Sequence, residues 1–226
     1  MKYVAVIPAR GGSKGLPGKN TMLLHNKPLV CWSIEQARRS SKIARVLVST
    51  DCPQIAQIAV EAGAEVPELR PSHLASDTAS TESVMIHVAQ NWLEWQEDLV
   101  IVLLQPTSPI RLASTLDNAI TYFEQQNADS LVSVCESHSF FWTNIQNPKA
   151  QYDFMNRPRR QDIQPVERLY RENGSIYLTK LPQLKKAGNR LAGRIAMYCM
   201  SEVESWEIDS ITDFNIVSQL LKESGI

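Results

Sequence analysis

A glycine-rich, cationic segment over residues 8–20 is the part of this sequence whose residue types point most directly to chemistry. It reads PARGGSKGLPGKN and combines four glycines with Arg10, Lys14 and Lys19. Glycines let backbone N–H groups approach an anion closely, and cations neutralise the charge that remains. Since crowded cations repel one another without an anion, the segment indicates a phosphate site. The alternative is a solvated surface loop.

The order of residues in this loop excludes two common nucleotide-binding motifs. The dinucleotide motif GxGxxG requires glycines at offsets of two and five, and these four glycines do not supply that spacing. The P-loop motif fails because Ser13 replaces its first glycine and Asn20 replaces its magnesium-binding Ser or Thr. The chain is therefore not expected to be a nicotinamide dehydrogenase or a P-loop ATPase.

Carboxylates gather near the other end of the sequence, at Glu207, Asp209 and Asp213. In an extended segment, Glu207 and Asp209 project to the same side, with Ile208 opposite. Magnesium prefers carboxylate oxygens together with shared phosphate oxygens. The cluster is a candidate metal site, and the alternative is that it only begins a helix.

Alternating strands and helices are expected to hold these charged regions in place. Short apolar runs are typical of buried parallel strands, and apolar residues at helical spacing predict the helices between them. The alternation over the first 135 residues implies an α/β layered fold with a mainly parallel sheet, whose ligands bind at the carboxyl ends of the strands. The predicted strands cover residues 3–7, 45–49, 99–104, 129–135, 175–178 and 194–200, and the predicted helices begin at Pro28, cover 53–62, run from Ser80 or Thr81 to about Trp95, and cover 112–126 and 212–223.

Length and composition limit the class of protein. With 226 residues, 43% of them hydrophobic and 21% charged, the chain is expected to form one globular domain over residues 1–226. The net charge of −1 does not support nucleic-acid binding, and no apolar run is long enough to span a bilayer. The four cysteines form no CxxC pair, which favours a reducing, cytoplasmic location.

A segment over about 140–173 interrupts the alternation of elements. It combines aromatic residues, three prolines and five arginines, and it is long for a loop in a compact domain. Aromatic residues beside arginines favour a subunit interface or a ligand lid, with a solvated surface excursion as the alternative. The arginines are Arg157, Arg159, Arg160, Arg168 and Arg171.

The loop PARGGSKGLPGKN resembles the signature of the CMP-sialic acid synthetases, which are the N-acylneuraminate cytidylyltransferases. Further pieces follow in the order of that family: STD at 49–51, RPSHLA at 70–75, LQPTSP at 104–109, RQ at 160–161, ENGSIY at 172–177 and EID at 207–209. The resemblance covers essentially the whole chain. It implies a Rossmann-like nucleotidyltransferase fold with helices on both faces of the sheet, an arm at 140–173 that forms a homodimer, CTP as substrate, and Mg²⁺ or Mn²⁺.

The implied reaction is attack by the anomeric hydroxyl of a nine-carbon 2-keto sugar acid on the α-phosphate of CTP, which releases pyrophosphate. By resemblance, Lys19 stabilises the transition state, Arg10 and Lys14 hold the triphosphate, and Asp209 is the main metal ligand. Glu207 is a second metal candidate, although the family pattern usually has Asp there. The implied CTP-binding residues are Arg10, Gly11, Gly12, Ser13, Lys14, Lys19, Asn20, Arg70 and Ser80. Without the resemblance, Arg70 would be interpreted as a surface residue.

Recognition of the sugar acid is assigned by the same resemblance. Gln105 suits a hydrogen bond to a hydroxyl or acyl amide, and Arg160 suits a bidentate pair with the carboxylate. The spacer after Arg160 leaves open whether Arg168 or Arg171 contacts the sugar. No histidine is an obvious general base. The implied sugar-binding residues are Gln105, Arg160, Gln161, Arg171 and Tyr177.

Three functions remain open from the sequence. The leading one is activation of N-acetylneuraminate or a bacterial relative such as legionaminate. The second is the cytidylyltransferase for the eight-carbon acid KDO, whose loop lacks the GSKG run. The third is a catalytically silent nucleotide-binding protein that uses the arm as an interaction surface, and the intact set of cations with Asp209 argues against it.

Overall fold

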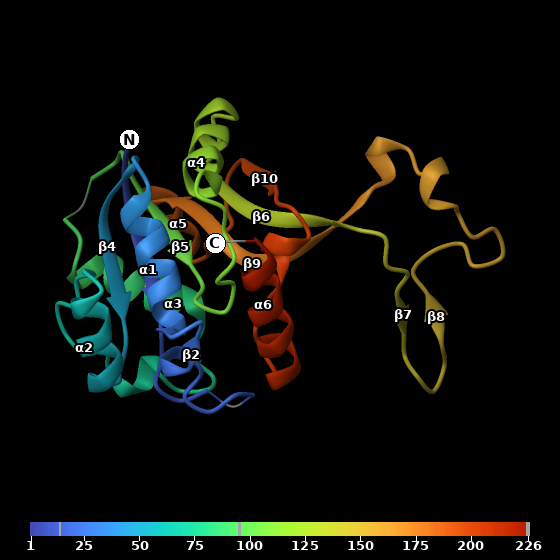
Figure 1. Ribbon diagram of the computed structural model, residues 1–226. Coiled ribbons are helices and arrows are strands. Elements are labelled where there is room, and N and C mark those ends of the chain that lie inside the picture. The colour runs from blue at the N-terminus through green and yellow to red at the C-terminus, as the bar shows by residue number, and fades with distance from the viewer. Residues whose placement is uncertain (14, 95, 225–226) are drawn as a thin grey trace.

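A mixed six-stranded sheet forms the centre of the computed structural model, which describes residues 1–13, 15–94 and 96–224 (Figure 1). Its strands are β1 (Lys2–Pro8), β4 (Ile43–Ser49), β5 (Leu99–Leu104), β6 (Ser130–Ser137), β9 (Leu169–Lys180) and β10 (Ile195–Cys199). They lie in the order β10–β6–β9–β5–β1–β4. β9 is antiparallel to its neighbours β5 and β6, and the other three pairs are parallel. The predicted α/β fold with a mainly parallel sheet is confirmed.

Helices cover both faces of this sheet. α1 (Leu29–Arg39), α2 (Pro53–Glu61) and α4 (Thr115–Gln125) pack on one face, and α3 (Thr81–Asn91) and α5 (Leu181–Ala187) pack on the other. Because side chains alternate along a strand, Ala5 of β1 joins the first apolar layer and Val6 joins the second. α6 (Ile211–Ser224) packs beside α1, where its Val217 and Leu221 share a third cluster with Trp32.

Some elements differ from the pattern expected from sequence. β9 begins at Leu169 rather than at residue 175. The sequence pattern did not indicate this start because the first four residues of the strand are exposed and form no continuous apolar run. α5 was not expected, since it buries only Leu181 and Leu184 over seven residues. α3 ends at Asn91, and Trp95, to which a longer helix was predicted, lies outside the described residues.

The segment 140–168 extends away from the body as an arm (Figure 1). It contains a small hairpin, β7 (Trp142–Thr143) with β8 (Lys149–Ala150), and the 3-10 turns η3 (Arg160–Asp162) and η4 (Pro165–Glu167). Its aromatic rings pack on one another, with Phe140 4.4 Å from Tyr152 between ring centroids. Trp142 and Phe154 nevertheless remain about half exposed. The arm is therefore held by its own rings and still presents apolar surface.

The strand order opens a crevice beside the carboxyl end of β1. The chain runs from β1 to β4 on one side, whereas β5 lies on the other, so the loops after β1 and β5 leave the sheet in different directions. Two short strands, β2 (Leu23–Leu24) and β3 (Lys27–Pro28), lead from the first loop into α1.

In the described part of the chain, none of the helices has the length and apolar character needed to cross a bilayer.

Candidate active site

A cleft of about 400 Å³ lies at this crevice. Its walls are the loop after β1, the segment 70–84, the loop after β5 and the acidic segment before α6. Among the residues predicted from sequence, it brings together Arg10, Ser13, Lys19, Asn20, Arg70, Ser80, Gln105 and Asp209. No histidine lines the cleft within the described residues, so a general base is still not evident.

The loop after β1 is held open by its own polar contacts. The amide nitrogen of Asn20, which is buried, donates to the Arg10 carbonyl at 2.9 Å. The Arg10 guanidinium reaches across to Asp77 at 2.9 Å and to the Ser76 carbonyl at 3.2 Å. A triphosphate would therefore compete with Asp77 for Arg10, which places this cation at the rim of a preformed site.

Gly11 and Gly12 of this loop differ in the space around them. The N–H of Gly11 donates to the Asp51 carboxylate at 2.9 Å, and a Cβ there would lie 2.9 Å from the Cys52 Cβ. Gly12 has open space around it, so its place in the loop is free for an approaching ligand. Lys14, a predicted phosphate ligand, lies outside the described residues.

Lys19 joins the cationic loop to the acidic segment. Its ammonium group donates to the Ile208 carbonyl at 2.7 Å and to Asp209 Oδ1 at 3.1 Å. Only 13% of the Lys19 side chain is exposed, whereas 73% of the Asp209 side chain is exposed. A Cβ on Gly15 would lie 2.6 Å from the Asp209 carbonyl oxygen, so only glycine permits this close approach. The cation is thus fixed, and the carboxylate is left open to the cleft.

Glu207 lies beside Gln105 at a glycine of β9. Gly174 has a φ of +61°, and a Cβ there would lie 2.7 Å from Gln105 Oε1 and 3.0 Å from Glu207 Oε1. Burial raises the pKa of Glu207, and the negative charge of Asp209 raises it further. Gly174 therefore provides the space in which the Gln105 amide and the Glu207 carboxyl meet.

The pair of Glu207 and Asp209 fits a divalent cation in its chemistry. Both supply hard oxygen donors. Burial, and after it the charge of Asp209, raises the pKa of Glu207, and a bound cation would offset both effects. Within the described residues no three His, Cys, Asp or Glu side chains form a ready-made metal cage. Magnesium commonly takes one or two carboxylates and completes its shell with phosphate and water, so Glu207 and Asp209 are candidate ligands by their chemistry.

Asp213 has the role considered from sequence as the alternative to metal binding, which is to begin a helix. Its Oδ2 accepts hydrogen bonds from the Ser210 N–H at 2.8 Å, the Ser210 hydroxyl at 2.8 Å and the Asp209 N–H at 3.1 Å. These hydrogen bonds lower the pKa of Asp213. Asp213 therefore stabilises the start of α6.

Arg70 and Ser80 shape the wall opposite the acidic segment. Arg70 is 5% exposed and donates to the Ser49 carbonyl at 2.7 Å and the Leu74 carbonyl at 3.2 Å. Burial lowers the pKa of Arg70, and the nearby Asp51 opposes that shift. The Ser80 hydroxyl accepts from the Ser83 N–H at 3.1 Å and caps α3. Arg70 is thus a buried part of the wall, which its sequence context alone did not indicate.

Two of the predicted sugar residues, Arg171 and Tyr177, do not line the cleft, and Arg171 lines a separate hollow of about 610 Å³ together with Arg160. Arg171 donates to the Ser205 carbonyl at 3.2 Å, and its charge lowers the pKa of the nearby Glu207. Tyr177 is 2% exposed and donates a short hydrogen bond to Glu172. The Arg190 guanidinium stacks on its ring at 4.4 Å. Tyr177 is therefore placed to support the cleft from below rather than to line it.

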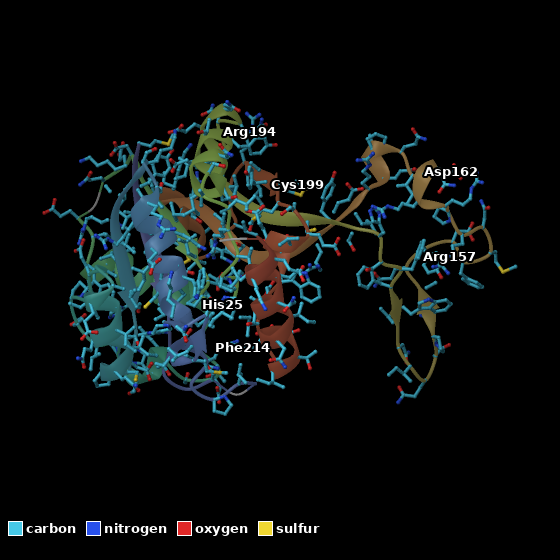
Figure 2. The ribbon with its side chains drawn as sticks, viewed as in Figure 1. His25, Arg157, Asp162, Arg194, Cys199 and Phe214 are labelled. Atoms are coloured by element: carbon cyan, nitrogen blue, oxygen red, sulfur yellow. The ribbon has the colours of Figure 1, made fainter. Side chains whose placement is uncertain are left out.

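The other two predicted sugar residues lie on the arm. Arg160 and Gln161 belong to η3 and border a separate hollow of about 890 Å³ at the base of the arm. Figure 2 shows Asp162, of the same turn, far from the body. Arg168 lies nearby, with its guanidinium 3.6 Å from Glu136. Within one chain, the structure does not bring Arg160 and Gln161 to the cleft.

Two polar residues that sequence reasoning missed organise the floor of the site. Arg111 is fully buried, although the LQPTSP motif ends only two residues before it. Asn173, inside the ENGSIY motif, accepts from the Ser133 hydroxyl at 2.6 Å and donates to the Ser205 hydroxyl at 2.8 Å. The only sequence signal for Arg111 and Asn173 was their position beside or within these motifs, because neither residue has an unusual spacing of its own.

Comparisons with known proteins point in one direction. A family model described as cytidylyltransferase matches residues 4–215. The CMP-N,N'-diacetyllegionaminic acid synthase of Legionella pneumophila is 34% identical over 230 residues, which cover 98% of this chain and 97% of that protein. The N-acylneuraminate cytidylyltransferase of Streptococcus agalactiae serotype V is 31% identical over 234 residues, which cover all of this chain but 55% of that protein.

Solved structures share the fold at lower identity. CMP:2-keto-3-deoxy-manno-octonic acid synthetase, complexed with CTP, superimposes with a TM-score of 0.72 at 19% identity, over 99% of this chain and 100% of that one. The 4-diphosphocytidyl-2C-methyl-D-erythritol synthase of Anaerococcus prevotii gives a TM-score of 0.68 at 9% identity, over 98% of each chain. The likeness confirms the nucleotidyltransferase fold predicted from sequence.

Proposed function

Because the chain belongs to the cytidylyltransferase family, we propose that it transfers CMP from CTP to the anomeric hydroxyl of a nine-carbon 2-keto sugar acid. The acid is N-acetylneuraminate or a bacterial relative such as legionaminate. The observation that carries the proposal is the single cleft in which Lys19, Asp209 and Gln105 meet. A cation suited to phosphate, a carboxylate suited to a metal and a neutral amide suited to a sugar line the same cleft, which supports the proposal.

The triphosphate is bound by the loop after β1. Arg10 leaves Asp77 for the phosphates, and Lys19, already held at the Ile208 carbonyl, faces the α-phosphate. The anomeric oxygen forms a bond to the α-phosphorus as the bond to the bridging oxygen of pyrophosphate breaks. Positioning and charge stabilisation supply most of the catalysis in such a transfer. Lys14, Gly11, Gly12, Ser13 and Asn20 complete the phosphate site, and Arg70 and Ser80 form the cytidine side.

Asp209 and Glu207 are the residues that would hold Mg²⁺ or Mn²⁺. The metal, when bound, supplies positive charge to the phosphate oxygens at the reacting phosphorus. Asp209 is the more direct candidate, since most of its side chain is exposed to the cleft while Glu207 is more than half buried. Lys19 then shares the charge of Asp209 and stays oriented towards the phosphates.

The sugar acid lies between Gln105 and the acidic segment. The Gln105 amide hydrogen-bonds a hydroxyl or the acyl amide of the sugar, while Arg171 and Tyr177 stabilise the strand behind it. We propose that the chain forms a homodimer through the exposed aromatic rings of the arm. In that dimer, Arg160 and Gln161 complete the cleft of the partner subunit and bind the sugar carboxylate.

The alternatives from sequence are less well supported. The eight-carbon acid KDO remains the second candidate substrate, but relatives that name nine-carbon acids match at 31% and 34% identity. The solved structure of the KDO synthetase is only 19% identical in sequence to this chain, so the match supports the fold alone. A catalytically silent protein would have no use for Asp209 beside Lys19. We propose the cytoplasm as the location because of the composition and because the four cysteines are scattered.

A pyrophosphate-release assay with a panel of acids tests this proposal. CTP and Mg²⁺ are supplied with N-acetylneuraminate, N,N'-diacetyllegionaminate or KDO, and each product is identified by mass. We expect release with at least one nine-carbon acid and little with KDO. The Asp209→Ala variant is the matched blank. No release with any of the acids would contradict the enzymatic proposal, and preference for KDO would replace it with the second candidate.

A further inference from the structure

Arg111 is a buried cation that none of the roles above uses. It follows the loop after β5, and only 2% of it is exposed. One nitrogen, Nη1, donates to the Ser33 hydroxyl at 3.1 Å and to Gln36 Oε1 at 2.8 Å, both on α1. The other, Nη2, donates to the Gln105 carbonyl at 3.1 Å and to the Ser175 carbonyl at 2.8 Å. The side chain therefore ties α1 to two strands of the sheet.

The two carbonyls lie where β5 and β9 separate. The antiparallel pairing of these strands ends at Leu104 opposite Ile176. The next residues outward are Gln105 and Ser175, and in place of a direct ladder bond their carbonyls both accept from Nη2 of Arg111. Nη2 of a guanidinium carries two N–H groups, so a single nitrogen can donate to both carbonyls at the fork. Arg111 thus sets how far the strands part.

The side-chain amide of Gln105 lies beside this fork. Gly174 is next to Ser175, and a Cβ on it would be 2.7 Å from Gln105 Oε1 and 2.9 Å from the Glu207 Cδ. Arg111 holds the backbone from which the Gln105 side chain starts and the backbone next to Gly174, against which the amide lies. A small change in the fork would move the amide relative to the carboxyl.

A role in packing alone does not account for Arg111. Among the described residues it has no ion-pair partner, and Glu204, whose charge it feels, accepts hydrogen bonds from the Leu112 N–H and the Thr115 hydroxyl. Burying a charge without a close partner is costly, and an apolar side chain of similar volume often serves stability as well. The guanidinium geometry, with its fan of donors, is what the fork requires.

We propose that Arg111 is a positioning residue for the sugar acid, which sets the Gln105 amide at the fork of β5 and β9. This inference rests on the proposed function and deepens it. CTP binds on the side of the cleft formed by the loop after β1, so Arg111 should affect binding of the acid and leave binding of CTP nearly unchanged. The consequence is a split between two Michaelis constants rather than a general loss of activity.

The test compares Arg111→Lys and Arg111→Met with the wild-type enzyme, using the acid that the panel selects. Lys retains the charge on one compact ammonium group but lacks the planar fork that spans both carbonyls and α1, and Met retains much of the volume but has no donor. We expect the KM for the acid to rise about tenfold in both variants, with the KM for CTP within about twofold of wild type. Phe123→Leu, a core change on α4 away from the cleft, is the control for lost stability.

The outcomes separate the inference from the function it rests on. Suppose that the wild type is active and the Arg111 variants change both KM values equally, or behave like Phe123→Leu. That result would overturn the role of Arg111 and leave the enzyme proposal standing. A wild type that activates no acid would overturn both. If the Arg111 variants do not fold, Ser33→Ala and Gln36→Ala loosen the guanidinium from α1. A smaller rise confined to the KM for the acid then supports the inference, and unchanged values contradict it.

Discussion

The two cationic regions of this molecule are held in different ways. In the cleft, the Lys19 ammonium is mostly buried and bonded to the Ile208 carbonyl, so its position is set by the body of the same chain. On the arm, Arg157 stacks on Phe140 at 4.3 Å and the exposed Arg159 pairs with Asp162 three residues along. Figure 2 shows Arg157 and Asp162 far from the body. The proposed phosphate site is thus preorganised by contacts within one subunit, whereas the arm carries its arginines away from that cleft and towards a hollow of its own.

Removal of Asp209, the proposed metal ligand, should give the largest effect in the cleft. Asp209→Ala is expected to lower kcat by about 1,000-fold, because the charge at the reacting phosphorus loses its support. Most of this side chain is exposed, so the thermal midpoint should hardly change. Pyrophosphate release at saturating Mg²⁺ measures the effect, and activity near wild type would refute the metal role.

Asp213→Ala provides the matched control for that variant. It removes the carboxylate that accepts from Ser210 and from the Asp209 N–H at the start of α6. It should cost about 1 kcal/mol of unfolding free energy and lower kcat far less than Asp209→Ala does. Together the two variants separate the carboxylate that serves the cleft from the one that serves the helix.

A mixing experiment tests whether the arm acts on the partner subunit. Arg160→Ala and Asp209→Ala are each expected to be nearly inactive as homodimers. If the two residues act in the same site from different subunits, an equimolar mixture contains mixed dimers in which one of two sites is intact. Random exchange then restores about a quarter of the wild-type activity. Sedimentation confirms the dimers, and a mixture as inactive as its components would place Arg160 outside the partner's cleft.

The cation in the cleft should give the next largest effect. Lys19→Ala is expected to lower kcat about 100-fold while the KM for the acid stays within a few-fold of wild type. Steady-state kinetics with each substrate varied measures this split. Lys27→Ala, which removes an ion pair with Glu35 at 2.6 Å outside the cleft, is the control. A Lys19 variant that changes mainly the KM for the acid would move this residue out of the phosphate site.

The smallest effect concerns stability and pH. Asp129 accepts from the Arg194 N–H at 3.0 Å and from Lys180 at 3.0 Å, and these contacts lower its pKa. Its stabilisation is therefore present above the ordinary pKa of aspartate and is lost as pH falls through the lowered value. Asp129→Asn should lower the thermal midpoint by about 3 °C at pH 7, and the difference should shrink towards pH 3.

Asp162, a carboxylate on the arm, provides the control for the thermal midpoint of Asp129→Asn. Asp162→Asn breaks an ion pair whose two side chains are 48% and 73% exposed, and it should leave the melting temperature unchanged. A loss equal to that of Asp129→Asn would show that the arm contributes to the stability of the body after all.

Much of the cleft could be predicted from sequence because a parallel sheet brings the ends of its strands together. The loops after β1 and β5 lie about 90 residues apart in the chain, yet Lys19 and Gln105 line one cleft as expected. Residues whose role depends on burial were harder to assess. Arg70 looked like a surface residue and is buried, and Tyr177 lies behind the cleft because β9 turns its ring towards α3 and α5.

Sequence pattern alone was sufficient for the α/β class, the order of the motifs and the family, since these follow from local periodicity and from residue types in a row. Packing in three dimensions decided which charges are fixed and which are open. It placed Glu207 beside Gln105 at Gly174, set Arg111 under a fork of two strands, and carried Arg160 away from the cleft of its own chain. Those relations depend on distances between segments far apart in the chain, and no local pattern of residues encodes such distances.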